Sequence, residues 1–176
     1  MAYNPDVHRR RSIRLPHFDY TCAGAYFVTI CTYQRECLFG TLINGTTCHN
    51  EFGKITHQRW HELPEHFENI ALDQFVVMPN HIHGIIILND VPPTVGATHA
   101  SSVPKPRPIG TIVGSFKSAV SRQINAHRNT QGKPVWQRNY YEHIIRGDRD
   151  LAAVRKYIAD NPTKWTEDEN YPERLL

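Results

Sequence analysis

Residues 25–33 are rich in the β-branched and aromatic residues that fit a pleated sheet. Residues 72–78 and 81–88 are two largely apolar segments separated only by Pro79-Asn80, which is turn chemistry between antiparallel neighbours, so they predict two more strands. Residues 140–145 predict a fourth strand. The chain is therefore expected to contain a sheet of four strands.

Apolar residues recur at helical spacing between these strands. Residues 50–67 predict one helix, strained near its end by Pro64, and residues 111–126 predict a second. Gly40 and Asn44-Gly45 mark turns ahead of the first helix. The apolar faces of the two helices consist of Phe52, Ile55, Trp60, Leu63 and Phe67, and of Ile112, Phe116, Ala119, Val120 and Ile124.

A third helix is predicted after Gly147, which ends the fourth strand. Asp148 or Asp150 can cap its start, and Leu151, Val154, Ile158 and Trp165 line one side. The resulting order is β-α-β-β-α-β-α. It describes an α+β protein with a ferredoxin-like four-stranded antiparallel sheet and an added C-terminal helix.

The length of 176 residues suits a single domain spanning residues 1–176. Residues 1–20 form a basic N-terminal arm, and residues 89–109 hold five prolines without hydrophobic periodicity, so we expect a mobile loop there. Hydrophobic residues make up 40% of the chain and charged residues 21%, which excludes a fully disordered protein.

Positive charge is concentrated in two regions, although the net charge is only +3 and the pI about 8.7. Phosphate attraction is one use for such clusters, and a solvated surface is the plain alternative. The candidate DNA-binding residues are Arg9, Arg10, Arg11 and Arg14 in the arm, and Lys117 and Arg122 in the second predicted helix.

The cysteines and apolar runs bear on the compartment. Cys22, Cys31, Cys37 and Cys48 form no CxxC pair and follow no apolar signal segment, so we interpret them as reduced thiols of a cytoplasmic protein. Runs such as residues 75–78 and 85–88 are too short to span a bilayer. No membrane role is expected.

His81-Ile82-His83 is the first candidate for chemistry. Side chains alternate faces along a strand, so the two imidazoles project from the same side while Ile82 points the other way. Imidazole nitrogen binds divalent metals and can share a Mg or Mn site with oxygen donors and water. The plain alternative is a pair of hydrogen-bonded histidines beside the core.

The last predicted helix holds a second candidate. Tyr157 and Asn161 stand four residues apart and share a face, so a nucleophile and a third metal ligand could enter one site together. A tyrosine hydroxyl has an ordinary pKa of about 10 and needs a base, or a metal that polarises its target. Otherwise Tyr157 simply flanks the apolar stripe of the helix.

Five segments together resemble the single-tyrosine HUH transposases of bacterial insertion sequences, especially the REP-associated tyrosine transposases. The resemblance covers nearly the whole chain, and its specific part is the combination of an HUH triplet with a downstream helical tyrosine. The segments are Arg9-Arg10-Arg11-Ser12-Ile13-Arg14, Tyr26-Phe27-Val28-Thr29, Val77-Met78-Pro79-Asn80-His81-Ile82-His83-Gly84, Trp136-Gln137 and Val154-Arg155-Lys156-Tyr157-Ile158-Ala159-Asp160-Asn161-Pro162.

The resemblance implies a metal-dependent endonuclease and strand transferase with a ferredoxin-like fold. His81 and His83 would hold Mg or Mn, and Tyr157 would attack single-stranded, hairpin-associated DNA to leave a 5′-phosphotyrosine link and a free 3′-hydroxyl. The insertion-sequence pattern has a glutamine as third ligand, where this chain has Asn161. Pro162 disfavours helical geometry at Asn161, which could instead serve as a cap. The protein could be a monomer or a homodimer.

Other residues offer alternatives. Tyr140 and Tyr141 lie near His143 and compete with Tyr157 as nucleophile, and Trp136 could either stack a splayed base or belong to the core. A non-catalytic module that binds single-stranded nucleic acid is the main rival function, since exposed aromatics on a ferredoxin-like sheet serve that purpose. Its candidates are Tyr26, Phe27 and Tyr33. A hydrolase of small phosphoesters ranks last, because no carboxylate neighbours the triplet.

Overall fold

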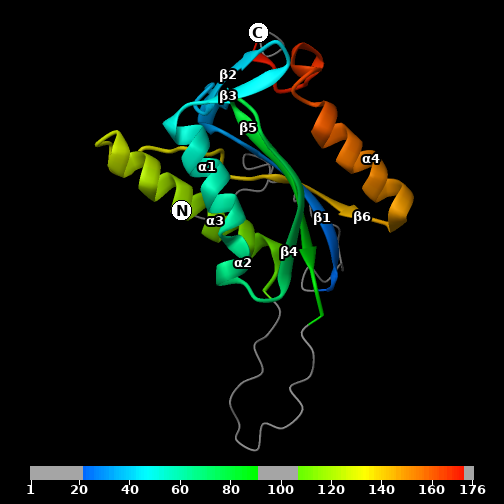
Figure 1. Ribbon diagram of the computed structural model, residues 1–176. Helices are drawn as coiled ribbons and strands as arrows, with labels where there is room; N and C mark the ends of the chain where they lie inside the picture. The colour runs from blue at the N-terminus through cyan, green and yellow to red at the C-terminus, as the bar shows by residue number, and fades with distance from the viewer. Residues whose placement is uncertain (1–21, 91–106, 173–176) are drawn as a thin grey trace, which may run out of the picture.

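The computed structural model describes residues 22–90 and 107–172, and a four-stranded antiparallel sheet lies at its centre (Figure 1). Its strands are β1 (Gly24–Cys31), β4 (Ile70–Val77), β5 (His81–Leu88) and β6 (Tyr141–Ile145). They lie in the order β4-β5-β1-β6, and every neighbouring pair is antiparallel. The predicted α+β, ferredoxin-like arrangement is confirmed.

Two helices, α1 (Glu51–His61) and α3 (Ile109–His127), cover one face of the sheet (Figure 1). The side chain of Asn50 starts α1 by accepting hydrogen bonds from two backbone N–H groups. The main apolar core lies between these helices and the sheet, and Trp60 is fully buried there. Gly84 faces Trp60 from β5, where a Cβ atom would come within 2.3 Å of the indole.

Helix α4 (Gly147–Asp160) covers the opposite face of the sheet (Figure 1). Ile158 is fully buried in a smaller apolar cluster, against which Leu151 and Val154 also pack. At the start of α4, the carboxylate of Asp150 accepts a hydrogen bond from the backbone N–H of Arg146 at 2.8 Å. Asp150 therefore contributes to the predicted cap.

A second, two-stranded sheet was not predicted. It is the hairpin of β2 (Gly40–Ile43) and β3 (Thr46–His49). Asn44 and Gly45, with φ of 51° and 73°, form the turn between these strands, so the predicted turn is present although the strands around it were missed. Each strand has only four residues and no apolar run, which is why the pattern gave no signal.

The predicted helix over residues 50–67 is wrong in its length. Helix α1 ends at His61, and a separate short helix, α2 (Leu63–His66), follows with Pro64 in its first turn. Proline has no backbone N–H, so it cannot continue a helix that has already begun. It is tolerated in the first turn of a new helix, where backbone N–H groups have no partner within the helix.

Trp165 was expected to line the last helix, and this was also wrong. Helix α4 ends at Asp160, just ahead of Pro162, and Trp165 lies in a 3-10 turn, η2 (Trp165–Glu167). A second 3-10 turn, η1 (Tyr33–Arg35), follows the first strand.

Two predicted segments lie mostly or wholly outside the described residues. They are the N-terminal arm, with Arg9, Arg10, Arg11 and Arg14, and most of the proline-rich segment 89–109.

The cysteines and the helices can be compared with the sequence directly. All four cysteines are free. None of the helices that the structure describes is both long and apolar enough to cross a lipid bilayer.

Candidate metal and nucleophile site

His81 and His83 project from β5 toward the α4 side of the sheet. Both side chains are buried, with 0% and 1% exposure, and their Nε2 atoms are 3.0 Å apart. The alternate residues Ile82 and Gly84 point into the main core on the other face. The predicted convergence of the two imidazoles on one point is therefore present.

Each histidine is held by a polar neighbour at its other ring nitrogen. The amide of buried Asn80 donates to two backbone carbonyls, so its Oδ1 accepts from His81 Nδ1 at 2.9 Å, which leaves a lone pair on His81 Nε2. Thr29 Oγ1 lies 2.8 Å from His83 Nδ1 and can either donate or accept. Both rings are thus fixed in orientation, as the histidines of metal sites are.

Tyr157 reaches this pair from α4. Its hydroxyl lies 3.4 Å from His83 Nε2, while its ring packs edge-on against Phe27 with centroids 5.9 Å apart. The tyrosine is 44% exposed and lines a cavity, so part of its side chain is open to solvent. A residue 74 positions along the chain is therefore in contact with the histidine pair within a single chain.

Asp168, which sequence reasoning did not select, completes the group. Its Oδ2 lies 4.0 Å from His83 Nε2, and the potential ligand atoms of His81, His83 and Asp168 all lie within 4.8 Å of one another. Asp168 comes from the turn after η2, and the backbone N–H of Asn170 donates to its Oδ1 at 2.6 Å. A single carboxylate in a segment without periodicity offers no sequence signal.

Asn161 lies at the end of α4, as the following proline predicted. Its Nδ2 donates to Asp168 Oδ2 at 2.8 Å, whereas its Oδ1 is buried and has no hydrogen-bond partner. A buried acceptor without a partner costs free energy unless something else binds it. The donor set of two imidazoles, one carboxylate and one free amide oxygen therefore fits a divalent ion.

The charges of the group depend on one another. Burial, and then the neighbouring His83, hold the pKa of His81 well below its usual value, and burial also lowers the pKa of His83. Both rings are therefore neutral near pH 7, as metal ligation requires. Burial alone would raise the pKa of Asp168, but its interactions with His83 and Asn161 outweigh this and lower it. Burial, followed by the charge of Asp168, raises the pKa of Tyr157 to about 12.

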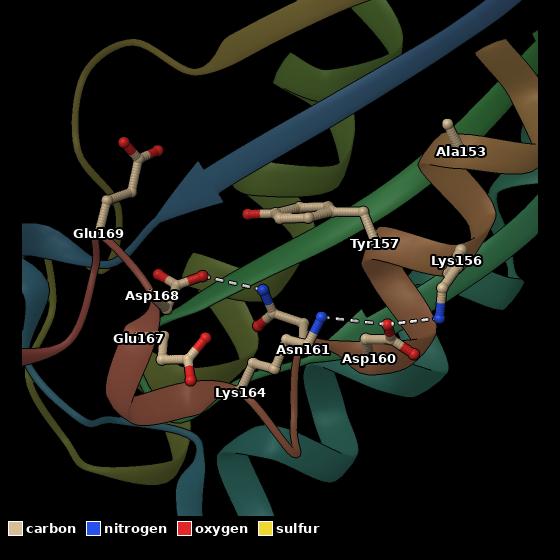
Figure 2. A pocket seen from close by; sticks show the side chains of 9 residues that line it. All are labelled: Ala153, Lys156, Tyr157, Asp160, Asn161, Lys164, Glu167, Asp168 and Glu169. Carbon is tan, nitrogen blue, oxygen red and sulfur yellow. Dashed lines mark hydrogen bonds and ion pairs between the residues drawn. The ribbon is translucent and has the colours of Figure 1, made fainter.

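A cavity of about 420 Å³ opens beside Tyr157, between α4 and residues 167–169. Figure 2 shows the Tyr157 hydroxyl directed toward the Asp168 side of this cavity. Glu167, Asp168 and Glu169 line it, whereas Lys156 and Lys164 both pair with Asp160. Negative charge surrounds the tyrosine, so an anionic substrate would need a cation there.

Two of the predicted DNA-binding residues have other roles. Trp136 is only 6% exposed and packs between Phe39 and Phe116, so the prediction that it stacks a base is wrong and the core alternative is correct. The ammonium of Lys117 donates to the backbone carbonyls of residues 137–139, which fixes that loop. Arg122 is exposed on α3, the helix layer across the sheet from Tyr157.

The aromatic residues named for the rival functions are mostly covered. Tyr26 and Phe27 have 0% and 7% exposure, since the helix layers cover both faces of β1, while Tyr33 is 41% exposed. The hydroxyl of Tyr140 donates to Glu142 at 2.7 Å. Tyr141 is 50% exposed on β6 and lies on the α4 side, where its ring contacts Phe27.

Comparison with known proteins indicates the family. A Haemophilus influenzae protein described as a REP-associated tyrosine transposase is 31% identical to this chain over 147 residues, which cover 83% of this chain and 74% of that protein. The chain belongs to the REP-associated tyrosine transposase family. An uncharacterised H. influenzae protein is 42% identical over 176 residues, covering 96% of this chain and 97% of its own length.

The transposase fold is also found among solved structures. A REP-associated tyrosine transposase bound to a REP hairpin aligns with a TM-score of 0.54 and 19% identity, over 86% of this chain and 74% of that one. This likeness concerns the fold. No protein-family model matches the chain.

Within this transposase-type protein, sequence reasoning missed three residues that shape the site. Thr29 and Asn80 orient the histidines, and Asp168 adds the carboxylate. Asn80 directly precedes the triplet and could have been found as a polar neighbour, and Thr29 is the β1 residue paired with His83.

Proposed function

We propose that this protein is a metal-dependent endonuclease and strand transferase that cuts single-stranded, hairpin-associated DNA with Tyr157 as nucleophile. The observation that carries the proposal is the contact between the Tyr157 hydroxyl and His83 Nε2 at 3.4 Å, within one chain. It brings a reactive oxygen to the point where two neutral imidazoles converge. Because one chain supplies every member of the group, the proposal holds for a monomer as well as for a homodimer.

The chain's own residues would hold Mg²⁺ or Mn²⁺ through His81 Nε2, His83 Nε2, a carboxylate oxygen of Asp168 and Oδ1 of Asn161. A divalent ion there supplies positive charge that polarises the scissile phosphate. Thr29 supports ligation by His83 because its hydroxyl can accept a proton from Nδ1, which frees the lone pair of Nε2. The partnerless Oδ1 of Asn161 supports its place in the set.

The reaction would proceed by a single displacement. The phenolic oxygen of Tyr157 forms a bond to phosphorus, the bond between phosphorus and the 3′ oxygen breaks, and in the net step the phenolic proton passes to that 3′ oxygen. The products are a 5′-phosphotyrosine and a free 3′-hydroxyl, and the reverse step rejoins strands without a nucleotide cofactor. Burial, followed by the charge of Asp168, raises the pKa of Tyr157 to about 12, so the hydroxyl carries its proton near pH 7.

The DNA partner is proposed from the family and from the solved relative bound to a REP hairpin. Arg122 on α3 and the arginines of the N-terminal arm are the proposed phosphate contacts. A non-catalytic binding module is less well supported, since Tyr26 and Phe27 are covered.

The proposal is tested by incubating the protein with end-labelled single strands that carry a REP-like hairpin, in Mn²⁺, in Mg²⁺ and in EDTA. We expect a covalent protein–DNA adduct with metal and none in EDTA, and we expect mass spectrometry to find the nucleotide on Tyr157. His81→Ala should lose the adduct. Cleavage that leaves no adduct, or an adduct on another tyrosine, would overturn the assignment.

A further inference from the structure

A second group of histidines lies on α1, away from the site described above. His57 and His61 stand four residues apart on the exposed side of the helix, with ring centroids 4.4 Å apart. This is the spacing at which one helix face presents two imidazoles to a single zinc ion. The intervening residues, Gln58-Arg59-Trp60, lack the glutamate that accompanies such pairs in metalloproteases, so no hydrolytic role is indicated.

In two of the histidine rings of this region, a hydrogen bond occupies one ring nitrogen and leaves the lone pair on the other. His61 Nδ1 donates to the carbonyl oxygen of His57 at 2.9 Å, which leaves the lone pair on Nε2. His49, from β3, donates through Nε2 to the carbonyl oxygen of Val77 at 3.1 Å, which leaves the lone pair on Nδ1. A hydrogen bond donated by one ring nitrogen fixes the tautomer in which the other ring nitrogen can bind a metal.

His49 lies beside His57, although the two come from different elements. The His49 and His57 ring centroids are 6.3 Å apart, and β3 contacts α1 (Figure 1). The ring nitrogens of His49, His57 and His61 do not all come within 4.8 Å of one another, so His49 is a neighbour of the pair rather than a third ligand. Phe75 borders the pair, with ring centroids 6.0 Å from His57 and 5.9 Å from His61. Burial, and then the neighbouring His61 and His49, lower the pKa of His57, so its ring is neutral near pH 7.

We propose that His57 and His61 together bind a divalent transition-metal ion such as Zn²⁺, Ni²⁺ or Cu²⁺. A donor pair made of imidazoles favours these ions over Mg²⁺ and Mn²⁺, which prefer oxygen ligands. Since α1 covers the face of the sheet opposite α4, this site is separate from His81, His83 and Asp168.

The experiment counts ions per chain by equilibrium dialysis and calorimetry against Ni²⁺ or Zn²⁺ alone. Under the proposed function the His81–His83 site also binds a divalent ion, so we expect the wild type to bind one ion more than either His57→Gln or His61→Gln. His66→Gln, which removes an exposed histidine from α2, is the matched control and should bind as many as the wild type. Equal stoichiometry in all four proteins would overturn the proposal.

One further measurement keeps the test decisive if a variant folds poorly. In the wild type, sub-stoichiometric Cu²⁺ should broaden the NMR ring signals of His57 and His61, and absence of broadening would contradict the site.

Discussion

The two faces of the central sheet differ in what they bury. On the α1–α3 face, β5 contributes Ile82, Ile86 and Leu88 to an apolar core. On the α4 face, the same strand contributes Ile85 to a small apolar cluster, and His81 and His83 to a polar group. One strand therefore serves the stability of the fold with one set of side chains and the candidate chemistry with the other.

The contrast indicates that stability and reactivity are separable in this molecule. The α1–α3 core supplies most of the apolar burial, whereas the α4 face holds the polar group, in which Oδ1 of Asn161 is buried without a hydrogen-bond partner. Substitutions on the α4 face should therefore change activity with little change in unfolding free energy, and substitutions on the α1–α3 face the reverse. The following experiments test that division.

The largest effect is expected for Tyr157→Phe, which should abolish the covalent DNA adduct because the attacking oxygen is lost. The ring should stay against Phe27, so the free energy of unfolding should change by less than about 0.5 kcal/mol. The measurement is adduct formation on a denaturing gel beside urea unfolding. Tyr141→Phe is the matched control, since this tyrosine is exposed on the same face, and it should retain the adduct. The opposite pattern would make Tyr141 the nucleophile.

On the other face, Trp60→Ala should lower the free energy of unfolding by about 3–5 kcal/mol. The indole is fully buried, stacks on Phe75 at 4.5 Å and meets Phe116 edge-on at 5.4 Å, so truncation leaves a cavity. Urea unfolding followed by circular dichroism measures the loss. Under conditions where the variant remains folded, adduct formation should be retained. A loss below about 1 kcal/mol would contradict the view that the α1–α3 face provides most of the stability.

A smaller effect is expected for Thr29→Val, which keeps the shape of the side chain but removes the hydroxyl next to His83 Nδ1. We expect Mn²⁺ affinity to fall by about 10- to 100-fold, since outer partners of metal-binding histidines have effects of that size. Calorimetry with Mn²⁺ measures it, with Thr46→Val on the exposed hairpin strand β3 as control. Equal affinity in the two variants would show that Thr29 does not orient the ring.

The smallest effect concerns the ion pair that joins α4 to β4. Arg155 Nε lies 3.0 Å from Asp73 Oδ1, and the arginine side chain is 50% exposed, so a double-mutant cycle with Asp73→Asn and Arg155→Gln should give a coupling of about 0.2–1 kcal/mol at pH 7. The hydrogen bond from Arg155 lowers the pKa of Asp73 despite partial burial.

The pH dependence of this coupling has a definite sign. Because the folded-state pKa of Asp73 is lowered, the stabilisation is present above the ordinary carboxyl pKa of about 3.9 and is lost as pH falls through the folded value. Urea unfolding of the four proteins at pH 7, 5 and 3 and near pH 2 measures the change. A coupling that stays constant down to pH 2 would contradict the assignment.

Much of this architecture is readable from local pattern. The largely apolar run after Pro79-Asn80 predicted β5, and the alternation of side chains along any strand predicted the shared face of His81 and His83. Helical spacing predicted that Tyr157 and Asn161 lie on one side of α4. These features depend on neighbours within a few residues. Pro64 gave a local signal for the break after His61, although the predicted helix continued to residue 67. The four-residue strands of the hairpin were missed, since such short segments show no hydrophobic pattern.

The rest of the candidate site depends on contacts between distant segments. Asp168 follows a 3-10 turn with no periodicity, and only the closure of that segment over β5 brings its carboxylate to the histidines. Trp136 illustrates the reverse error, because an aromatic residue after a loop is equally compatible with stacking a base and with the core, where it lies. Whether such a residue belongs to the site or to the core is decided by its distances to other side chains in the folded protein, and residue type alone does not give these distances.

The separation between His83 and Tyr157 has a consequence for the timing of synthesis. A nascent chain presents both histidines when β5 is complete, but the tyrosine is added only 74 residues after His83, and α4 must then dock on the sheet. A chain interrupted before α4 would carry the imidazole pair without any nucleophile beside it. Incomplete translation products would therefore be unable to cut DNA by the proposed route, and reactivity would arise only after the helix has folded into place.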